Sequence, residues 1–166
     1  MLTRRTALAS IAAAIASPNA LFGSPASGLE SSLQAIEKKS GGRLGVAVLY
    51  PQQKTPYHLH GDQRFPMCST FKFLAASLIL KRVDQGKEHL DRAISYTKAD
   101  LVTYSPETEK HAGGSMKVSE LCKAALTLSD NTAANLLLAS FGGPPAITSF
   151  ARSIGDNMTR LDRTET

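Results

Sequence analysis

The feature that most constrains the fold is a run of small and apolar residues at positions 133–139, Ala-Ala-Asn-Leu-Leu-Leu-Ala. At helical spacing this run is apolar on nearly every side, and such a helix is stable in water only when other elements surround it. The run closes at Phe141-Gly142-Gly143, and glycine is common directly after a helix. The sequence therefore predicts a buried central helix.

Four further segments show the apolar periodicity of helices that bury one face. Pro144 and Pro145 open the last of them, because proline is tolerated in the first turn of a helix. Residues 84–106 carry no clear pattern. The four predicted helices cover residues 29–39, 71–79, 118–126 and 144–154.

Two strand patterns follow the first predicted helix. Residues 43–50 alternate large and small side chains, and residues 57–60 follow after a turn at 51–54, which predicts a hairpin with its large face buried. His58 and His60 would point to one side of the second strand, as zinc ligands can. No further zinc motif lies nearby, so we interpret both as solvated strand residues.

The first residues have the layout of a secretory signal peptide. Arg4 and Arg5 precede an apolar run at 7–16 that is too short to span a bilayer, and small residues follow near Ala20 and Ala26. An amphipathic helix is the alternative, but the segment has no polar face. We expect export to the periplasm, and the paired arginines make the twin-arginine route a candidate.

Composition narrows the functional classes. The formal net charge is +5 over 166 residues, and the basic side chains are scattered, which argues against nucleic-acid binding. After the N-terminal segment, no apolar run is long enough to span a membrane. The remaining chain is long enough to form a domain with a real core.

A first chemical motif lies where the helix predicted at 71–79 begins. Ser69 and Lys72 form S-x-x-K after Pro66, which predicts that Ser69 lies in the first turn of that helix. A spacing of three residues then brings the lysine amine beside the serine hydroxyl. A serine becomes a nucleophile when a base removes its proton, and a partly desolvated lysine can act as that base. The alternative is an N-cap serine and a surface lysine; a second S-x-x-K, Ser95 to Lys98, has no evident role.

Two other motifs can likewise be interpreted either as helix caps or as catalytic groups. Ser129-Asp130-Asn131 precedes the apolar run, and these residue types are typical helix caps. The serine hydroxyl could equally relay a proton, and the asparagine amide could hold a substrate carbonyl or orient Lys72. Glu165 could belong to a helix cap or could be the base that activates water.

In this order and at these separations, the motifs resemble those of the class A serine β-lactamases, with S-x-x-K, S-D-N and a loop glutamate. The likeness covers nearly all of the chain after the signal segment. It is most specific at residues 64–72, 104–106, 129–137 and 160–165.

The resemblance implies a hydrolase that opens the ring of penicillin- and cephalosporin-type antibiotics in two stages. Ser69 would attack the lactam amide while Lys72 takes or relays its proton, to give an acyl-enzyme. Ser129 would pass a proton to the departing ring nitrogen. Glu165 would activate the water that releases Ser69, and either Lys72 or Glu165 could be the base for acylation.

The resemblance also implies the binding residues and the partners. Asn131 would hydrogen-bond the substrate side-chain amide, Tyr104 would line the mouth of the cleft, and the Ser69 backbone N–H would form half of an oxyanion hole. A small β-lactam molecule is the expected partner. No metal or cofactor is implied, and we expect a monomer.

The implied fold is a two-domain α/β (α+β) architecture, in which an antiparallel sheet with helices adjoins an all-helical domain and the cleft lies between them. In this chain the sheet domain is expected to be incomplete. The predicted parts are a signal peptide at 1–27, the first helix and hairpin of the sheet domain at 28–62, the all-helical domain at 63–155, and the start of the glutamate loop at 156–166.

The family sequence continues beyond Thr166, with a K-T-G strand that binds the substrate carboxylate. Arg163 resembles an arginine whose ion-pair partner lies in that later part. We therefore hypothesise that the chain is a partial sequence of a whole enzyme, and that the 166 residues alone are inactive.

The two cysteines fit the resemblance. Cys68 resembles a position that some carbapenem-hydrolysing members bridge to a cysteine on a later strand. Cys122 lies on the buried stripe of its predicted helix and is interpreted as core packing. A Cys68–Cys122 disulfide is not expected.

Two alternatives to a hydrolase remain at this point. A penicillin-binding peptidase or a β-lactam sensor shares S-x-x-K and a serine-x-asparagine but lacks the deacylating glutamate, so it stays acylated. The third interpretation is a polypeptide without activity. A hydrolase has the glutamate, here Glu165, and releases more than one equivalent of product. The sensor or peptidase has no such glutamate and stops at one equivalent.

Overall fold

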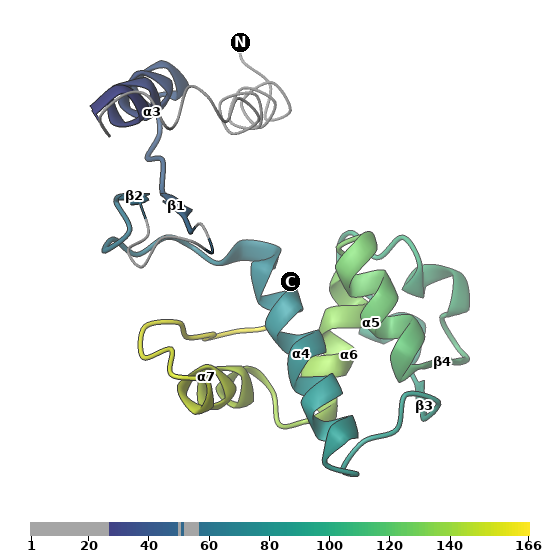
Figure 1. Cartoon of the computed structure of the whole chain (residues 1–166). Helices are drawn as coiled ribbons and strands as arrows, with labels where there is room; N and C mark the ends of the chain where they lie inside the picture. Colours follow the sequence, from purple (N-terminus) through teal and green to yellow (C-terminus); the bar gives the residue numbers. More distant parts are fainter. Residues whose placement is uncertain (1–26, 50, 52–56) are drawn as a thin grey trace. The chain divides into compact units, whose positions relative to one another are not determined.

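The computed structural model describes residues 27–49, 51 and 57–166 (Figure 1). All but the last residue of the predicted signal peptide, and most of the predicted hairpin turn, lie outside these residues. The chain divides into two compact units, Met1–Pro66 and Met67–Thr166.

The first unit holds helix α3, Ser27–Ser40, and strands β1, Val46–Val48, and β2, Tyr57–Leu59. The strands pair antiparallel, with Val46 opposite Leu59 and Val48 opposite Tyr57. The predicted helix and hairpin are therefore confirmed, although both strands are shorter than expected. The expected alternation is present, since Val46 and Val48 are half-buried and Ala47 is exposed.

One histidine of the hairpin differs from its interpretation. His58 is exposed, but His60 is half-buried with Nε2 at 3.2 Å from Glu37 Oε2. The other oxygen of Glu37 accepts a hydrogen bond from the backbone N–H of Leu44 at 2.8 Å. Glu37 therefore joins α3 to the hairpin, which a strand pattern alone does not indicate because the partners are far apart in sequence.

The second unit is built around four helices. They are α4, Phe71–Asp84, α5, Val118–Thr127, α6, Asn131–Ser140, and α7, Pro144–Ser153. Figure 1 shows α4 running between α7 and the pair α5 and α6, and α4 packs against all three. Each helix contributes fully buried apolar side chains, including Ile79, Leu121, Leu137 and Ile147.

All the predicted helices are confirmed. The apolar run lies on α6, where Ala133, Ala134, Leu137 and Leu138 are fully buried. Ala139 is nevertheless exposed, and the helix that contacts all three others is α4. Helix α4 thus holds the central position that the sequence assigns to α6.

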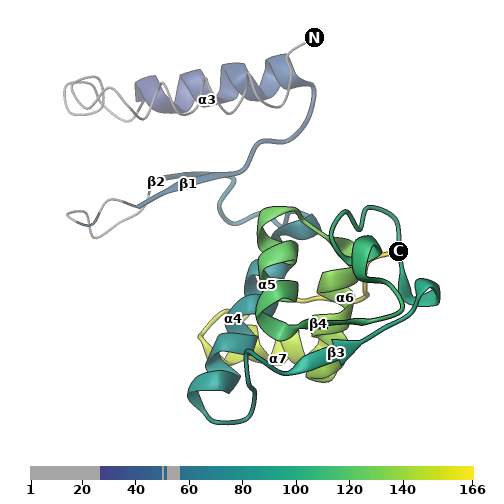
Figure 2. The same cartoon turned by 90° about the vertical axis from the view of Figure 1, so that its right-hand side faces the viewer.

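The structure adds a small sheet to a region that the sequence predicts to contain only helices and irregular chain. Strand β3, Ala93–Ser95, pairs antiparallel with β4, Ser115–Lys117, with Ile94 opposite Met116. Figure 2 shows the two strands side by side and β4 leading into α5. The pattern that predicted β1 extends over eight residues, 43–50, and no alternating run of that length was recognised around β3 or β4.

Among the described residues, no helix is both long enough and apolar enough to cross a bilayer.

Candidate active site

Ser69 lies in a short 3₁₀ turn, Cys68–Thr70, that runs directly into α4. The sequence placed Ser69 in the first α-helical turn, and the structure corrects this to the preceding 3₁₀ turn. The backbone N–H and the side-chain hydroxyl of Thr70 both donate to the carbonyl of Met67, which is the i to i+3 pattern that often tightens a helix start. The Ser69 hydroxyl accepts a hydrogen bond from Lys72 Nζ at 3.4 Å.

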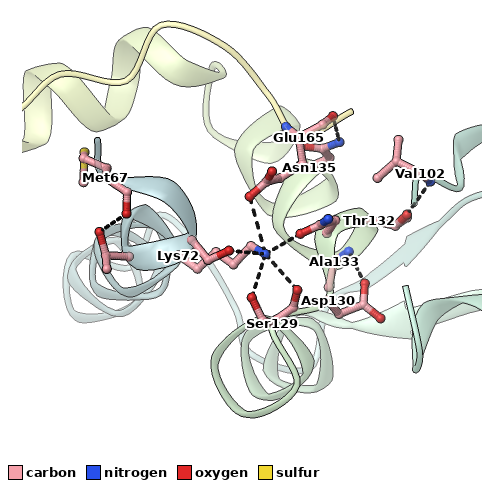
Figure 3. Close-up of polar contacts among 12 residues, drawn as sticks. Met67, Lys72, Val102, Ser129, Asp130, Thr132, Ala133, Asn135 and Glu165 are labelled. Carbon is pink, nitrogen blue, oxygen red and sulfur yellow. Dashed lines mark hydrogen bonds and ion pairs between the residues drawn. The ribbon is translucent and has the colours of Figure 1, made fainter. Parts of the chain in front are cut away.

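Lys72 is 2% exposed and lies among oxygens from three segments of the chain (Figure 3). Its Nζ donates to the Ser129 carbonyl at 2.8 Å, to Ser129 Oγ at 3.1 Å and to Asn131 Oδ1. It also lies 3.5 Å from Glu165 Oε1. An ammonium group has three protons, so these oxygens and Ser69 Oγ compete for them. The structure thus brings five of the six predicted site residues together.

Burial and neighbouring carboxylates act in opposite directions on the pKa of Lys72. Burial lowers its pKa below the ordinary value for lysine, whereas the carboxylates of Glu165 and Asp130 act in the opposite direction. A lysine in this position is better suited to exchange protons with its neighbours than a surface lysine is.

Asp130 connects the S-D-N segment to the neighbouring loop. It caps α6 and is fully buried. Its Oδ1 accepts from the Ala133 N–H and the Thr108 hydroxyl, both at 2.8 Å, and its Oδ2 accepts from the N–H groups of Glu107 and Thr108, both at 2.9 Å. The S-D-N segment therefore combines both interpretations: Asp130 is a structural cap, while Ser129 and Asn131 face Lys72.

An Asp130→Ala variant is expected to lose about 3 to 5 kcal/mol of unfolding free energy, since buried donors that bind a carboxylate lose their partner. Urea denaturation followed by circular dichroism measures the loss. Asp162→Ala is the matched control, because Asp162 is an exposed partner of Arg160 and such pairs contribute about 1 kcal/mol or less. A loss below about 1 kcal/mol in Asp130→Ala would contradict the structural role.

Tyr104 lies beside the cluster without contacting Lys72. Its backbone has a positive φ of 62°, and its side chain is 63% exposed. Its carbonyl accepts from the Asn131 N–H at 3.1 Å, and the neighbouring Thr103 carbonyl accepts from Asn131 Nδ2 at 2.8 Å. The loop that carries Tyr104 is therefore fixed to the start of α6, and a role of its side chain in substrate binding stays a prediction.

Asn135 is a site residue that sequence reasoning missed. Its Oδ1 accepts from the Glu165 N–H at 2.9 Å, and its Nδ2 donates to the Glu165 carbonyl, also at 2.9 Å. This pair holds the backbone of Glu165 on α6 and leaves its carboxylate facing Lys72. The signal in the sequence is a single amide within an otherwise apolar run.

Both cysteines are free. Cys68 is exposed and has a positive φ of 48° beside Ser69. Cys122 is half-buried, and burial raises the pKa of its thiol to about 11. Within the residues that the structure describes, no group of three or more histidine, cysteine, aspartate or glutamate side chains is placed to hold a metal ion.

Comparison with known proteins agrees with these motifs. Residues 28–166 match the model of the β-lactamase enzyme family. β-Lactamase Toho-2 of Escherichia coli is 48% identical over 170 residues, which cover 99% of this chain and 58% of the relative. β-Lactamase CTX-M-97 of the same organism is also 48% identical, over 84% of this chain and 48% of the relative.

Solved structures give the same result. An ancestral (GNCA) class A β-lactamase is 64% identical with a TM-score of 0.79, over 81% of this chain and 52% of that chain. The putative class A β-lactamase PenP from Rhodopseudomonas palustris is 62% identical with a TM-score of 0.80, over 82% and 52% respectively.

The chain spans about half the length of the relatives that it matches. Within that span the solved neighbours share its mixed α and β fold, which confirms the predicted fold class. The family match extends from α3 through the Ser69, Ser129 and Glu165 motifs. This chain therefore belongs to the β-lactamase enzyme family, and within it to the class A enzymes.

Proposed function

We propose that the protein containing this chain is a serine hydrolase that opens the β-lactam ring of penicillin- and cephalosporin-type antibiotics through an acyl-enzyme on Ser69. One observation carries the proposal: the buried Lys72 amine lies within hydrogen-bonding or ion-pair distance of Ser69, Ser129 and Glu165. Nucleophile, proton relay and second base are thus linked through one side chain.

In the first stage Ser69 Oγ attacks the lactam carbonyl carbon and loses its proton to Lys72 or, through it, to Glu165. The ring C–N bond then breaks, and the ring nitrogen takes a proton from Ser129. Ser129 regains a proton from Lys72 Nζ, which lies 3.1 Å away. The products of this stage are an ester on Ser69 and a free amine.

In the second stage Glu165 takes a proton from water, and the hydroxide attacks the ester carbonyl. The bond to Ser69 Oγ breaks, and the proton that Glu165 took from water returns to the serine through Lys72, which contacts both. The side chain of Glu165 is 25% exposed, so it is accessible to solvent, whereas Lys72 is buried. This difference favours Glu165 as the base that activates water.

The hydrogen bonds of Asn131 support its assignment to substrate binding. Its Oδ1 accepts from Lys72, and one N–H of Nδ2 donates to the Thr103 carbonyl. A primary amide has two such N–H groups, so one remains to donate to a carbonyl on the substrate. The exposed Tyr104 side chain, on the adjoining loop, is assigned to the edge of the same site.

The remaining assignments rest on the sequence. The protein is proposed to be exported to the periplasm, from the layout of its N-terminal segment, and to act as a monomer without metal or cofactor.

The experiment that tests the function is the hydrolysis of a chromogenic cephalosporin by the 166-residue chain and by the complete product of its gene. We expect the complete product to release many equivalents of product per molecule. Release that stops at one equivalent would instead indicate a sensor or a peptidase, and no release at all would refute both interpretations.

A further inference from the structure

Glu165 lies in a segment that has neither helix nor strand. This segment, residues 156–166, is here called the Glu165 segment. Helix α6 holds its end through Asn135. Irregular chain without repeating backbone hydrogen bonds depends on such side-chain contacts for its position. The contacts made nearer its start therefore also bear on where Glu165 lies.

Thr148 on α7 makes a reciprocal contact with Leu161. The Leu161 N–H donates to Thr148 Oγ1 at 3.0 Å, and the Thr148 hydroxyl lies 3.5 Å from the Leu161 carbonyl. Leu161 also packs against the core of the helical unit. This contact fixes the middle of the Glu165 segment, four residues before Glu165.

Arg152, also on α7, holds the start of the Glu165 segment. Its guanidinium donates to the carbonyls of Asp156 at 2.6 Å and Thr159 at 2.8 Å. The Asp156 carboxylate accepts from the N–H groups of Met158 and Thr159 at 2.8 and 2.9 Å. Residues 156–159 therefore form a turn whose carbonyls are held by Arg152 and whose N–H groups are held by Asp156.

Thr148 and Arg152 are four residues apart, so they lie one above the other on one face of α7. The adjoining face of the helix is fixed in the core, since Ile147 and Ala151 are fully buried. Helix α7 packs against α4, the helix that carries Lys72. A continuous series of packed elements thus leads from Lys72 to the Glu165 segment.

We propose that Thr148 and Arg152 are positioning residues for Glu165. Together with Asn135, they set the 3.5 Å separation between the Glu165 carboxylate and Lys72 Nζ. The consequence for the reaction rests on the proposed function, and there they act on the second stage, because only that stage requires Glu165 to aim a water molecule at the ester. A catalytic group displaced by about 1 Å can lose roughly 100-fold in rate.

Backbone hydrogen exchange, measured by NMR on the complete protein, tests the positioning without any substrate. Thr148→Val removes the hydroxyl and keeps the volume. We expect exchange at the Leu161 and Glu165 amides to become about fivefold faster or more, while Thr148→Ser stays close to the parent protein. Thr127→Val is the matched control, because the hydrogen bond of the Thr127 hydroxyl among the described residues lies within α5, to the Lys123 carbonyl.

Arg152→Met provides a second variant at an exposed position, in case Thr148→Val does not fold. It should speed exchange at Thr159 and, more weakly, at Glu165. An unchanged exchange rate at the Glu165 amide in every folded variant would overturn the proposal. The contacts of Thr148 and Arg152 would then stabilise only the residues that they touch.

Transient kinetics on the same proteins separates this proposal from the proposed function. With a chromogenic cephalosporin we expect Thr148→Val to slow deacylation about tenfold and to change acylation less than twofold. Equal slowing of both stages would overturn the effect on the reaction. Absence of turnover in the parent protein would refute the proposed function, while hydrogen exchange would still decide the positioning.

Discussion

A Ser69→Ala variant of the complete protein is expected to hydrolyse β-lactams at least about 1,000-fold more slowly than the parent and to form no covalent adduct. The reason is that alanine has no oxygen to form the ester. Lys72 keeps its partners on Ser129, Asn131 and Glu165, so the loss should appear in turnover and not in stability. Steady-state rates and intact-protein mass spectrometry after incubation with substrate measure both effects.

The chain contains a matched control for this variant. Ser95 is the serine of the second S-x-x-K and lies exposed on β3. Ser95→Ala should leave both turnover and labelling unchanged. If Ser69→Ala is still acylated, the nucleophile is a different residue and the proposed mechanism fails at its first step.

A Glu165→Gln variant is expected to form the acyl-enzyme on Ser69 but to hydrolyse it only slowly. Loss of a general base costs about 10²- to 10⁴-fold, and the loss should fall on deacylation, so that one acyl group per molecule accumulates. The contacts with Asn135 involve the backbone of Glu165, which glutamine retains, so the segment should keep its position. Rapid-quench mass spectrometry follows the accumulation of the acyl-enzyme.

Glu109→Gln is the control for removing one negative charge, because Glu109 is exposed and belongs to the 3₁₀ turn Thr108–His111. It should turn over like the parent protein. Rapid deacylation in Glu165→Gln would mean that another group activates water. Slow acylation with no accumulated adduct would indicate instead that Glu165 is the base of the first stage.

Sequence reasoning is strongest where a feature is local. The helices were predictable because a buried face repeats every three to four residues over several turns, as on α5 and α7. Strands β3 and β4 were not, since no alternating run as long as residues 43–50, which predicted β1, was recognised around them. The 3₁₀ turn at Ser69 was also missed, because its residues are equally compatible with the first turn of an α-helix.

For the candidate site, the motifs identified the residues that surround Lys72 but not the contacts that hold them. Asn135 and Glu165 are 30 residues apart, and Thr148 and Leu161 are 13 residues apart. Such pairs form because helices pack and bring distant segments together, which no single-sequence pattern records. The domain boundaries and the signal peptide stay predictions.

Helix α6 carries Asn131 at its first turn and Asn135 one turn later. The first amide contacts Lys72, and the second holds Glu165. A slight rotation of α6 would shift both Asn131, the proposed substrate contact, and Glu165, the proposed base that activates water. A substitution that shifts α6 and so alters the substrate range should therefore also alter the rate of deacylation. Changes in selectivity should arise more readily in the surrounding loops.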